Sequence, residues 1–139
     1  MKLVKPKKNL GQHFLIDLEI ARRIADTVDA YPDIPVLEIG PGMGVLTQYL
    51  VTKNRDVKAV EIDSESVAFL HEHYPKLNDN IIGEDFLRMD LNEIFAGKQF
   101  VLTGNYPYDI SSQIFFKMLD YKELIQIGRA SCRERVSLS

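Results

Sequence analysis

The chain has 139 residues, a formal net charge of −3, 45% hydrophobic residues and 27% charged residues. This composition is ordinary for a globular protein, and the length allows one small domain with its own core. No apolar run approaches the roughly 20 residues that a membrane-spanning helix requires. The lysine-containing N-terminus lacks the apolar stretch of a secretory signal, so we expect a cytoplasmic protein. The only cysteine, Cys132, excludes an internal disulfide and a cysteine-rich zinc site, and we expect no metal.

The N-terminal segment concentrates positive charge. Lys5, Lys7 and Lys8 lie in it, and residues 1–8 contain no acidic residue. Such a basic arm can contact the phosphates of a nucleic acid and release counterions. A solvated terminus explains the same pattern, and the negative net charge argues weakly against a nucleic-acid partner.

A helix, a strand and a glycine turn follow in order. Asp17 is a candidate N-cap for a helix whose apolar residues recur at three- and four-residue steps as far as Val28. Tyr31–Pro35 ends that helix. Residues 36–39 form a short apolar run typical of a buried strand, and the glycines of 40–44 let a ligand approach bare backbone. This order predicts the first strand, turn and helix of a Rossmann-like sheet, whose ligands bind outside the carboxyl ends of the strands.

The glycine turn, Gly-Pro-Gly-Met-Gly, indicates the class of ligand. Val45 stands where a dinucleotide fingerprint has its third glycine, and Pro41 removes one N–H that could bind a phosphate. An adenosine ligand without a pyrophosphate fits better. Glu61 ends the next predicted strand, where a carboxylate can accept both ribose hydroxyls. The pattern resembles motifs I and II of S-adenosylmethionine-dependent methyltransferases, which makes Gly40, Gly42 and Glu61 candidate cofactor-binding residues. A strand end with a charged cap is the alternative.

Strands and helices alternate along the rest of the chain. Asp63 is a candidate cap for a helix that Pro75 ends, and strands are predicted at 80–83 and 100–104, with a helix after the second. We therefore expect an α/β fold of about four parallel strands. Asp85 follows the third strand, where its carboxylate can accept a hydrogen bond from an adenine amino group. A turn-initiating aspartate explains it nearly as well.

The sequence Asn105-Tyr106-Pro107-Tyr108 follows the fourth predicted strand. It resembles the motif of methyltransferases that act on adenine N6, an amine whose delocalised lone pair makes it a poor nucleophile. The side-chain oxygen of Asn105 can accept one N6 hydrogen, and a backbone carbonyl of the turn can accept the other. Pro107 fixes the turn, and Tyr108 offers a face on which the base can stack. We predict direct in-line methyl transfer to a base that is unpaired or flipped out of its helix. The alternative is a plain turn before a helix.

These motifs occur in order and, with the tract at residues 7–17, resemble the ribosomal RNA adenine N6-dimethyltransferase family, specifically its small-subunit (16S) enzymes. The resemblance covers residues 5–125. It implies S-adenosylmethionine-dependent dimethylation of two adjacent adenosines near the 3′ end of 16S rRNA, late in small-subunit assembly. We expect a monomer in which residues 1–16 form the basic arm and a segment that covers the cofactor, and 17–125 form a partial methyltransferase domain. His13 stands where many relatives have Asn.

The resemblance also implies roles for individual residues. Lys5, Lys7 and Lys8 fit contacts with RNA, and Asn105, Pro107 and Tyr108 fit the catalytic motif. Cofactor contacts are implied for six residues: His13, Leu15, Gly40, Glu61, Asp85 and Asn105.

The C-terminal segment, residues 126–139, has no clear apolar period and no strand signal. It resembles the conceptual translation of a sequencing adapter, so we expect a non-native tail; a genuine disordered tail is the alternative. The family fold would continue with more strands and a helical domain. Without them a sheet edge and apolar helix faces are exposed, and we expect the chain to be poorly stable and inactive by itself.

Two other functions remain open. One is a related methyltransferase that acts on 23S rRNA or on adenine N6 of DNA. The other is a non-catalytic RNA-binding factor for ribosome assembly. The presence of Gly42, Glu61 and Asn105 favours an enzyme over the second alternative.

Overall fold

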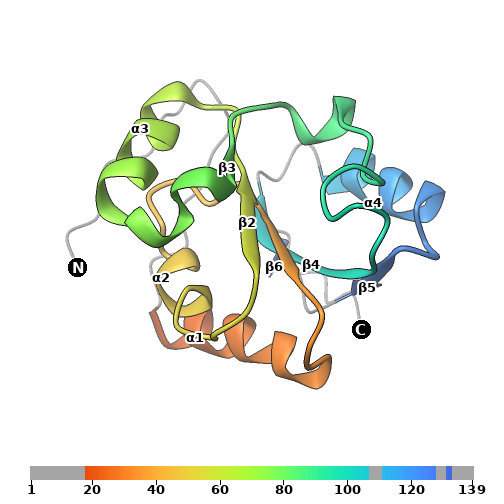
Figure 1. Cartoon of the computed structure of the whole chain (residues 1–139), viewed down its shortest axis with the longest axis horizontal. Helices are drawn as coiled ribbons and strands as arrows, with labels where there is room; N and C mark the ends of the chain where they lie inside the picture. The colour runs from red at the N-terminus through yellow and green to blue at the C-terminus, as the bar shows by residue number, and fades with distance from the viewer. Residues whose placement is uncertain (1–17, 107–110, 128–130, 133–139) are drawn as a thin grey trace.

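The computed structural model describes residues 18–106, 111–127 and 131–132 (Figure 1). Asn105 and Tyr106 are described through their backbone. Eight residues singled out in the sequence lie outside the described part of the chain, and the predictions about them stay predictions: Lys5, Lys7, Lys8, His13, Leu15, Asp17, Pro107 and Tyr108.

A parallel sheet forms the centre of the molecule (Figure 1). Its strands are β1 (Val36–Ile39), β2 (Val57–Val60), β3 (Ile81–Ile82), β4 (Phe100–Tyr106) and β5 (Ile125–Ile127), in the order β3-β2-β1-β4-β5. A short β6 (Ser131–Cys132) also pairs with β4 in parallel. The chain therefore winds outward from β1 to β3 and then returns to the other side of β1. This reversal creates a switch point between β1 and β4, the place where α/β sheets bind ligands.

The helices cover both faces of this sheet. The α-helices are α1 (Leu18–Asp26), α2 (Thr47–Leu50), α3 (Ser64–His73) and α4 (Ser111–Asp120), and 3-10 turns are η2 (Thr27–Ala30), η3 (Pro75–Asn80) and η4 (Phe86–Arg88). Figure 1 shows α1 and α2 on one side of the strands and α4 on the other.

Alternation along the strands supplies the two halves of the core. Val36 and Val101 face α1 and α2, where they pack with Ala21, Ile24 and Leu50. Their strand neighbours point the opposite way and pack with α4 and η4 in the second cluster, which includes Leu37, Leu102, Phe86, Ile114 and Met118. Successive side chains of a strand point to opposite faces, so one sequence serves both layers.

Most predicted elements are confirmed. The four strands lie where the apolar runs predicted them, and all pair in parallel. Asp63 caps α3, because its carboxylate accepts the backbone N–H of Ser66 at 3.0 Å. The helix predicted after the glycine turn is only the single turn of α2.

The sheet also extends beyond the prediction. Residues 126–139 were expected to lack strands, yet Gln126 and Ile127 belong to β5 and Ser131–Cys132 forms β6. The expected number of four strands was therefore too low. Strand pairing needs only backbone N–H and C=O groups, which the open edge of β4 provides, so the side-chain pattern did not reveal it.

In the part of the chain that the structure describes, no helix is both long and apolar enough to cross a membrane.

Candidate functional site

Strand register brings the predicted site residues to one edge of the sheet. Ile39 of β1 pairs with Val60 on one side and with Gly104 on the other. The next residues, Gly40, Glu61 and Asn105, therefore follow one another along the carboxyl edge. The Gly40 N–H continues the ladder by donating to the Val60 carbonyl at 2.9 Å. The predicted convergence of these three positions is present in the backbone.

The glycine loop between β1 and α2 is shaped by a contact that the sequence analysis missed. Gly44 has φ +85°, and a Cβ on it would lie 2.6 Å from Cε2 of Tyr74. The Tyr74 hydroxyl donates to the Gly44 carbonyl at 3.2 Å. Tyr74 follows α3, so this contact ties the end of that helix to the loop. Only glycine satisfies both the left-handed backbone and the close tyrosine ring.

Glu61 is fixed by two backbone donors. Its Oε1 accepts the Gly42 N–H at 2.8 Å, and its Oε2 accepts the Asp63 N–H at 3.0 Å. Burial raises the pKa of this carboxyl, and the two hydrogen bonds partly oppose the rise because they stabilise the charged form. The bond to Gly42 joins the two predicted cofactor motifs directly. The carboxylate is therefore oriented at the strand end before any ligand binds.

A second carboxyl, Glu38 of β1, lies behind the glycine loop and is fully buried. Its Oε1 accepts the Thr47 hydroxyl at 2.6 Å, while its Oε2 has no hydrogen-bond partner among the described residues. Burial raises the pKa of Glu38 to about 8, the Thr47 bond lowers it, and the charge of Glu61 raises it further. An orphaned buried acceptor is costly, and a proton held by this carboxyl reduces that cost.

Sequence analysis gave Glu38 no individual role. The available signal was a charged residue within an otherwise apolar four-residue strand.

Asp85 has one of its two predicted roles, that of a turn-initiating residue. It precedes η4, and its Oδ1 accepts the Leu87 N–H at 3.0 Å, the bond of a turn-initiating aspartate. The residue is half-buried and follows β3 at the same carboxyl edge as Glu61. The turn reading is therefore correct, and a cofactor role for Asp85 stays a prediction.

Close approach of two strands explains the glycine before the Asn-Tyr-Pro-Tyr motif. A Cβ on Gly104 would lie 2.5 Å from the carbonyl oxygen of Ile39. Any side chain at Gly104 would force β4 away from β1. Because Asn105 follows directly, Gly104 keeps the motif close to the glycine loop.

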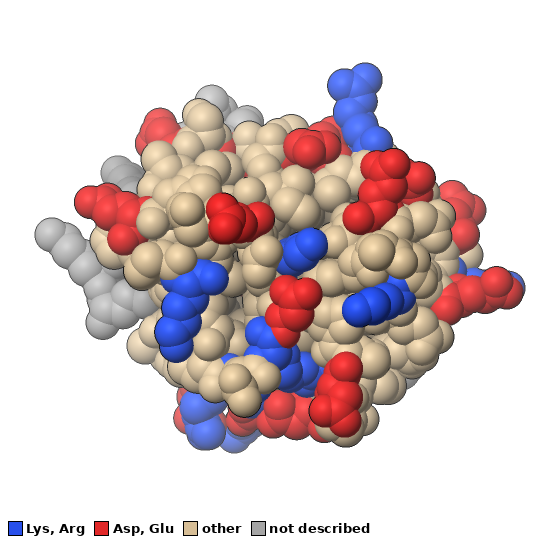
Figure 2. Space-filling view, viewed as in Figure 1, with Lys and Arg blue, Asp and Glu red and all other residues tan. Residues whose placement is uncertain are grey.

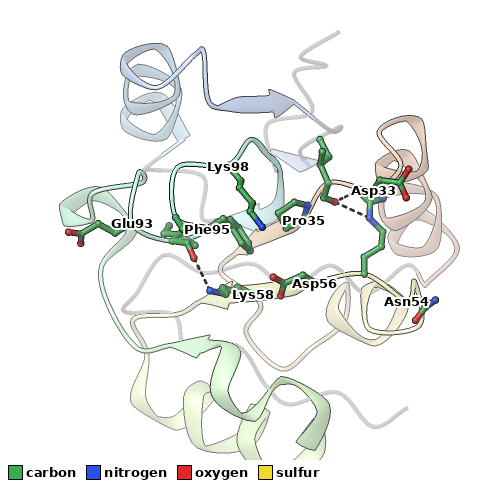
Figure 3. A pocket seen from close by; sticks show the side chains of 12 residues that line it. Asp33, Pro35, Asn54, Asp56, Lys58, Glu93, Phe95 and Lys98 are labelled. Carbon is green, nitrogen blue, oxygen red and sulfur yellow. Dashed lines mark hydrogen bonds between the residues drawn. The ribbon is translucent and has the colours of Figure 1, made fainter.

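A hollow of about 670 Å³ lies at the opposite, amino end of the strands (Figure 3). Arg55 there donates to the carbonyls of Val28 and Tyr31, both at 2.7 Å, and also to that of Ile34. Lys58 donates to the Ile94 carbonyl at 2.8 Å. These cations tie loops together by their backbone. Since α/β sheets bind ligands at the carboxyl edge, the candidate functional site lies at the end of the sheet opposite to this hollow.

Comparison of the sequence and the structure with known proteins identifies one family. A model of the family described as Ribosomal RNA adenine dimethylase matches residues 4–133. Ribosomal RNA small subunit methyltransferase A of Phocaeicola vulgatus is 70% identical over 125 residues, which cover 90% of this chain and 45% of that protein. The protein of that name from Porphyromonas gingivalis is 60% identical over 139 residues, covering 99% and 54%. The crystal structure of the 23S rRNA methyltransferase ErmE matches with TM-score 0.67 and 34% identity over 85% of this chain and 46% of that chain.

The chain thus spans about half the length of the curated relatives it matches. The family match and the Porphyromonas gingivalis alignment continue past residue 125, whereas the Phocaeicola vulgatus alignment has 125 residues. That residues 126–139 are non-native therefore stays a prediction.

Proposed function

Because the chain belongs to the ribosomal RNA adenine dimethylase family, we propose that it forms the cofactor-binding part of a 16S rRNA adenine N6-dimethyltransferase. The substrate would be two adjacent adenosines near the 3′ end of the RNA, in the small subunit or its precursor. The carrying observation is the hydrogen bond from Gly42 to Glu61, which holds a carboxylate at the strand edge where an adenosine would bind. The greater identity to proteins named for the small subunit than to the 23S enzyme favours 16S rRNA.

The residues fit S-adenosylmethionine as the cofactor. Each oxygen of Glu61 accepts one backbone N–H, and a carboxylate has about four acceptor positions, so acceptors remain for two ribose hydroxyls. The orphaned Oε2 of Glu38 suits a ligand that carries an ammonium group and a positive sulfur. A cation there favours the ionised carboxyl and would lower its raised pKa. We assign Asp85 to the adenine amino group, and His13 and Leu15 to the cover of the site.

S-adenosylmethionine supplies a methyl group on a positively charged sulfur. The contribution of this chain is to hold the target amine. In the proposed mechanism the Asn105 side-chain oxygen accepts an N6 hydrogen and orients the nitrogen lone pair. Pro107 fixes the turn, and Tyr108 stacks on the base. Gly104 supports this arrangement, because it allows the strand before Asn105 to lie against Ile39. Catalysis then rests mainly on positioning.

The RNA contacts are assigned to the N-terminal arm with Lys5, Lys7 and Lys8. On the face seen in Figure 2, Lys and Arg side chains are interspersed with Asp and Glu. Such a mixed surface gives weak attraction to a polyanion, because opposite charges cancel within about a Debye length. In this proposal the basic arm therefore supplies the positive charge that attracts RNA, which this face lacks.

The decisive experiment uses a chain extended to the full length of its relatives, assayed on small subunits that lack the modification. We expect N6-dimethyladenosine in 16S rRNA by mass spectrometry. Asn105→Ala should abolish it while ribosome binding persists, whereas Asn78→Ala, an exposed asparagine, should behave as wild type. Unchanged methylation by Asn105→Ala would refute the mechanism. In a parallel assay on large subunits, methylation of 23S rRNA with none of 16S rRNA would support the alternative enzyme. The 139-residue chain should give no product alone.

A further inference from the structure

Lys117 of α4 reaches across to the segment that follows β3. Its Nζ donates to the carbonyl of Phe86 at 2.7 Å and also to that of Met89. The same ammonium lies 5.3 Å from the centroid of the Phe86 ring and 5.9 Å from that of Tyr121. One side chain of α4 thus holds both ends of the η4 turn.

This interaction is more specific than a solvated surface lysine. Lys117 is half-buried, and burial lowers its pKa, whereas the charges of Asp85, Asp90 and Asp120 raise it. Burial of an ammonium is costly unless donors find acceptors, and two carbonyls and two ring faces provide that compensation. Phe86 and Met118 belong to the same buried apolar cluster, which already attaches α4 to η4. The lysine adds a directional restraint on the backbone.

The restraint joins two parts of the candidate site. The η4 turn begins after Asp85, which caps it through the Leu87 N–H, and the Arg88 N–H donates to the Asp85 carbonyl at 3.0 Å. On the other side, α4 begins at Ser111, shortly after the segment that contains Asn105. Lys117 therefore connects the acid assigned to adenine with the helix behind the methyl-transfer motif.

We propose that Lys117 is a positioning residue that fixes Asp85 for recognition of the amino group of the cofactor's adenine. The residue does not touch the cofactor; it acts through the carbonyls of Phe86 and Met89. The cofactor part of this proposal rests on the function proposed above, while the restraint on η4 can be tested without any ligand.

The restraint itself is tested by amide hydrogen exchange on the chain. Lys117→Met keeps the aliphatic stem and removes the donors. We expect the Leu87 and Arg88 amides to exchange about tenfold faster, equivalent to about 1.4 kcal/mol of local opening, while the Gly40 amide in the sheet is unchanged. Lys117→Arg, which keeps donors, should restore protection, and Lys122→Met, at an exposed lysine, should have no effect. Unchanged exchange at Leu87 in Lys117→Met would overturn the proposal.

A comparison of two ligands tests whether Lys117 positions Asp85 or only stabilises the fold. S-adenosylhomocysteine is compared with its inosine counterpart, which carries an oxygen in place of the amino group. We expect the wild-type chain to prefer the adenine ligand about tenfold, as one charged hydrogen bond allows, and Lys117→Met to lose most of this preference. Equal weakening of both ligands would mean a structural role only and would overturn the proposal. Binding of neither ligand by the wild type would refute the proposed function, and the exchange result would still decide whether Lys117 restrains η4.

Discussion

Replacement of Glu38 by glutamine should change how the stability of the chain depends on pH. Glu38 is fully buried, and its pKa is raised from 4.5 to about 8. Between these values the folded state keeps a proton that the unfolded chain has released. The favourable contribution is therefore complete below about pH 4.5 and is lost as the pH rises through about 8. At about 1.4 kcal/mol per pH unit, the loss is on the order of 5 kcal/mol.

The assay is urea unfolding followed by circular dichroism at several values between pH 5 and pH 8. The wild-type free energy of unfolding should fall steeply over this range. In Glu38→Gln the fall should be shallower, because Glu61, whose pKa is also raised, is the remaining buried carboxyl among the described residues that contributes in this direction. The variant should match the wild type near pH 5 and be more stable by several kcal/mol near pH 8.

Glu72→Gln provides the matched control. The Glu72 side chain is 79% exposed on α3, so this variant should keep the wild-type slope. If Glu38→Gln also keeps that slope, the account of Glu38 as a buried proton-holding group is wrong. If the account is right, Glu38→Gln is more stable than the wild type near pH 8 but binds a cationic cofactor less well. Such a loss of binding with a gain in stability is expected when a buried group destabilises the fold but contributes to a binding site.

Three further substitutions test the loops by urea unfolding. Gly44→Ala places a Cβ 2.6 Å from the Tyr74 ring at φ +85°, so it should lower the free energy of unfolding by about 1–3 kcal/mol. Adding Tyr74→Leu should recover part of this loss. A Gly44→Ala variant as stable as the wild type would contradict the contact. Ala96→Gly should stabilise the chain by about 0.5–1 kcal/mol. Ala96 has φ 54°, and the strain of this left-handed conformation in a non-glycine residue exceeds the entropy that glycine adds to the unfolded chain. Destabilisation would contradict the left-handed conformation of residue 96. Arg55→Ala removes the guanidinium donors of the Tyr31 and Ile34 carbonyls and leaves the Val28 carbonyl with the Tyr31 N–H alone, so it should cost about 2–3 kcal/mol; a cost near zero would mean that water replaces the guanidinium.

The strand ends were predictable because local sequence encodes them. Apolar runs followed by Gly40 and Glu61 predicted two adjacent parallel strands whose ends meet. Because that pattern involves only residues close in sequence, it does not predict contacts between distant segments. Tyr74 contacts Gly44, and Lys117 contacts Phe86, across segments distant in the chain. Such contacts depend on tertiary packing, which no spacing rule contains.

Two other features, the unpaired oxygen of Glu38 and strand β5, were not predicted from the sequence, for different physical reasons. The sequence assigned no role to Glu38. That its Oε2 is unpaired among the described residues is found only in the structure, where the Thr47 hydroxyl donates to the other oxygen. Strand β5 forms through backbone pairing, with Phe100 opposite Ile125. Its three residues, Ile-Gln-Ile, are fewer than the four to eight over which an alternating pattern identifies a strand, so the sequence did not predict it.

Calorimetric titration of S-adenosylmethionine into the chain tests the central claim most directly. Saturable one-site binding is expected for the wild type and for Glu72→Gln. Glu61→Gln keeps an acceptor for the Gly42 N–H but loses the charge that receives the ribose hydroxyls, so it should weaken binding at least about tenfold, as expected for a charged hydrogen bond. Equal affinities of Glu61→Gln and wild type, or no binding by either, would contradict the assignment of this strand edge as the cofactor site.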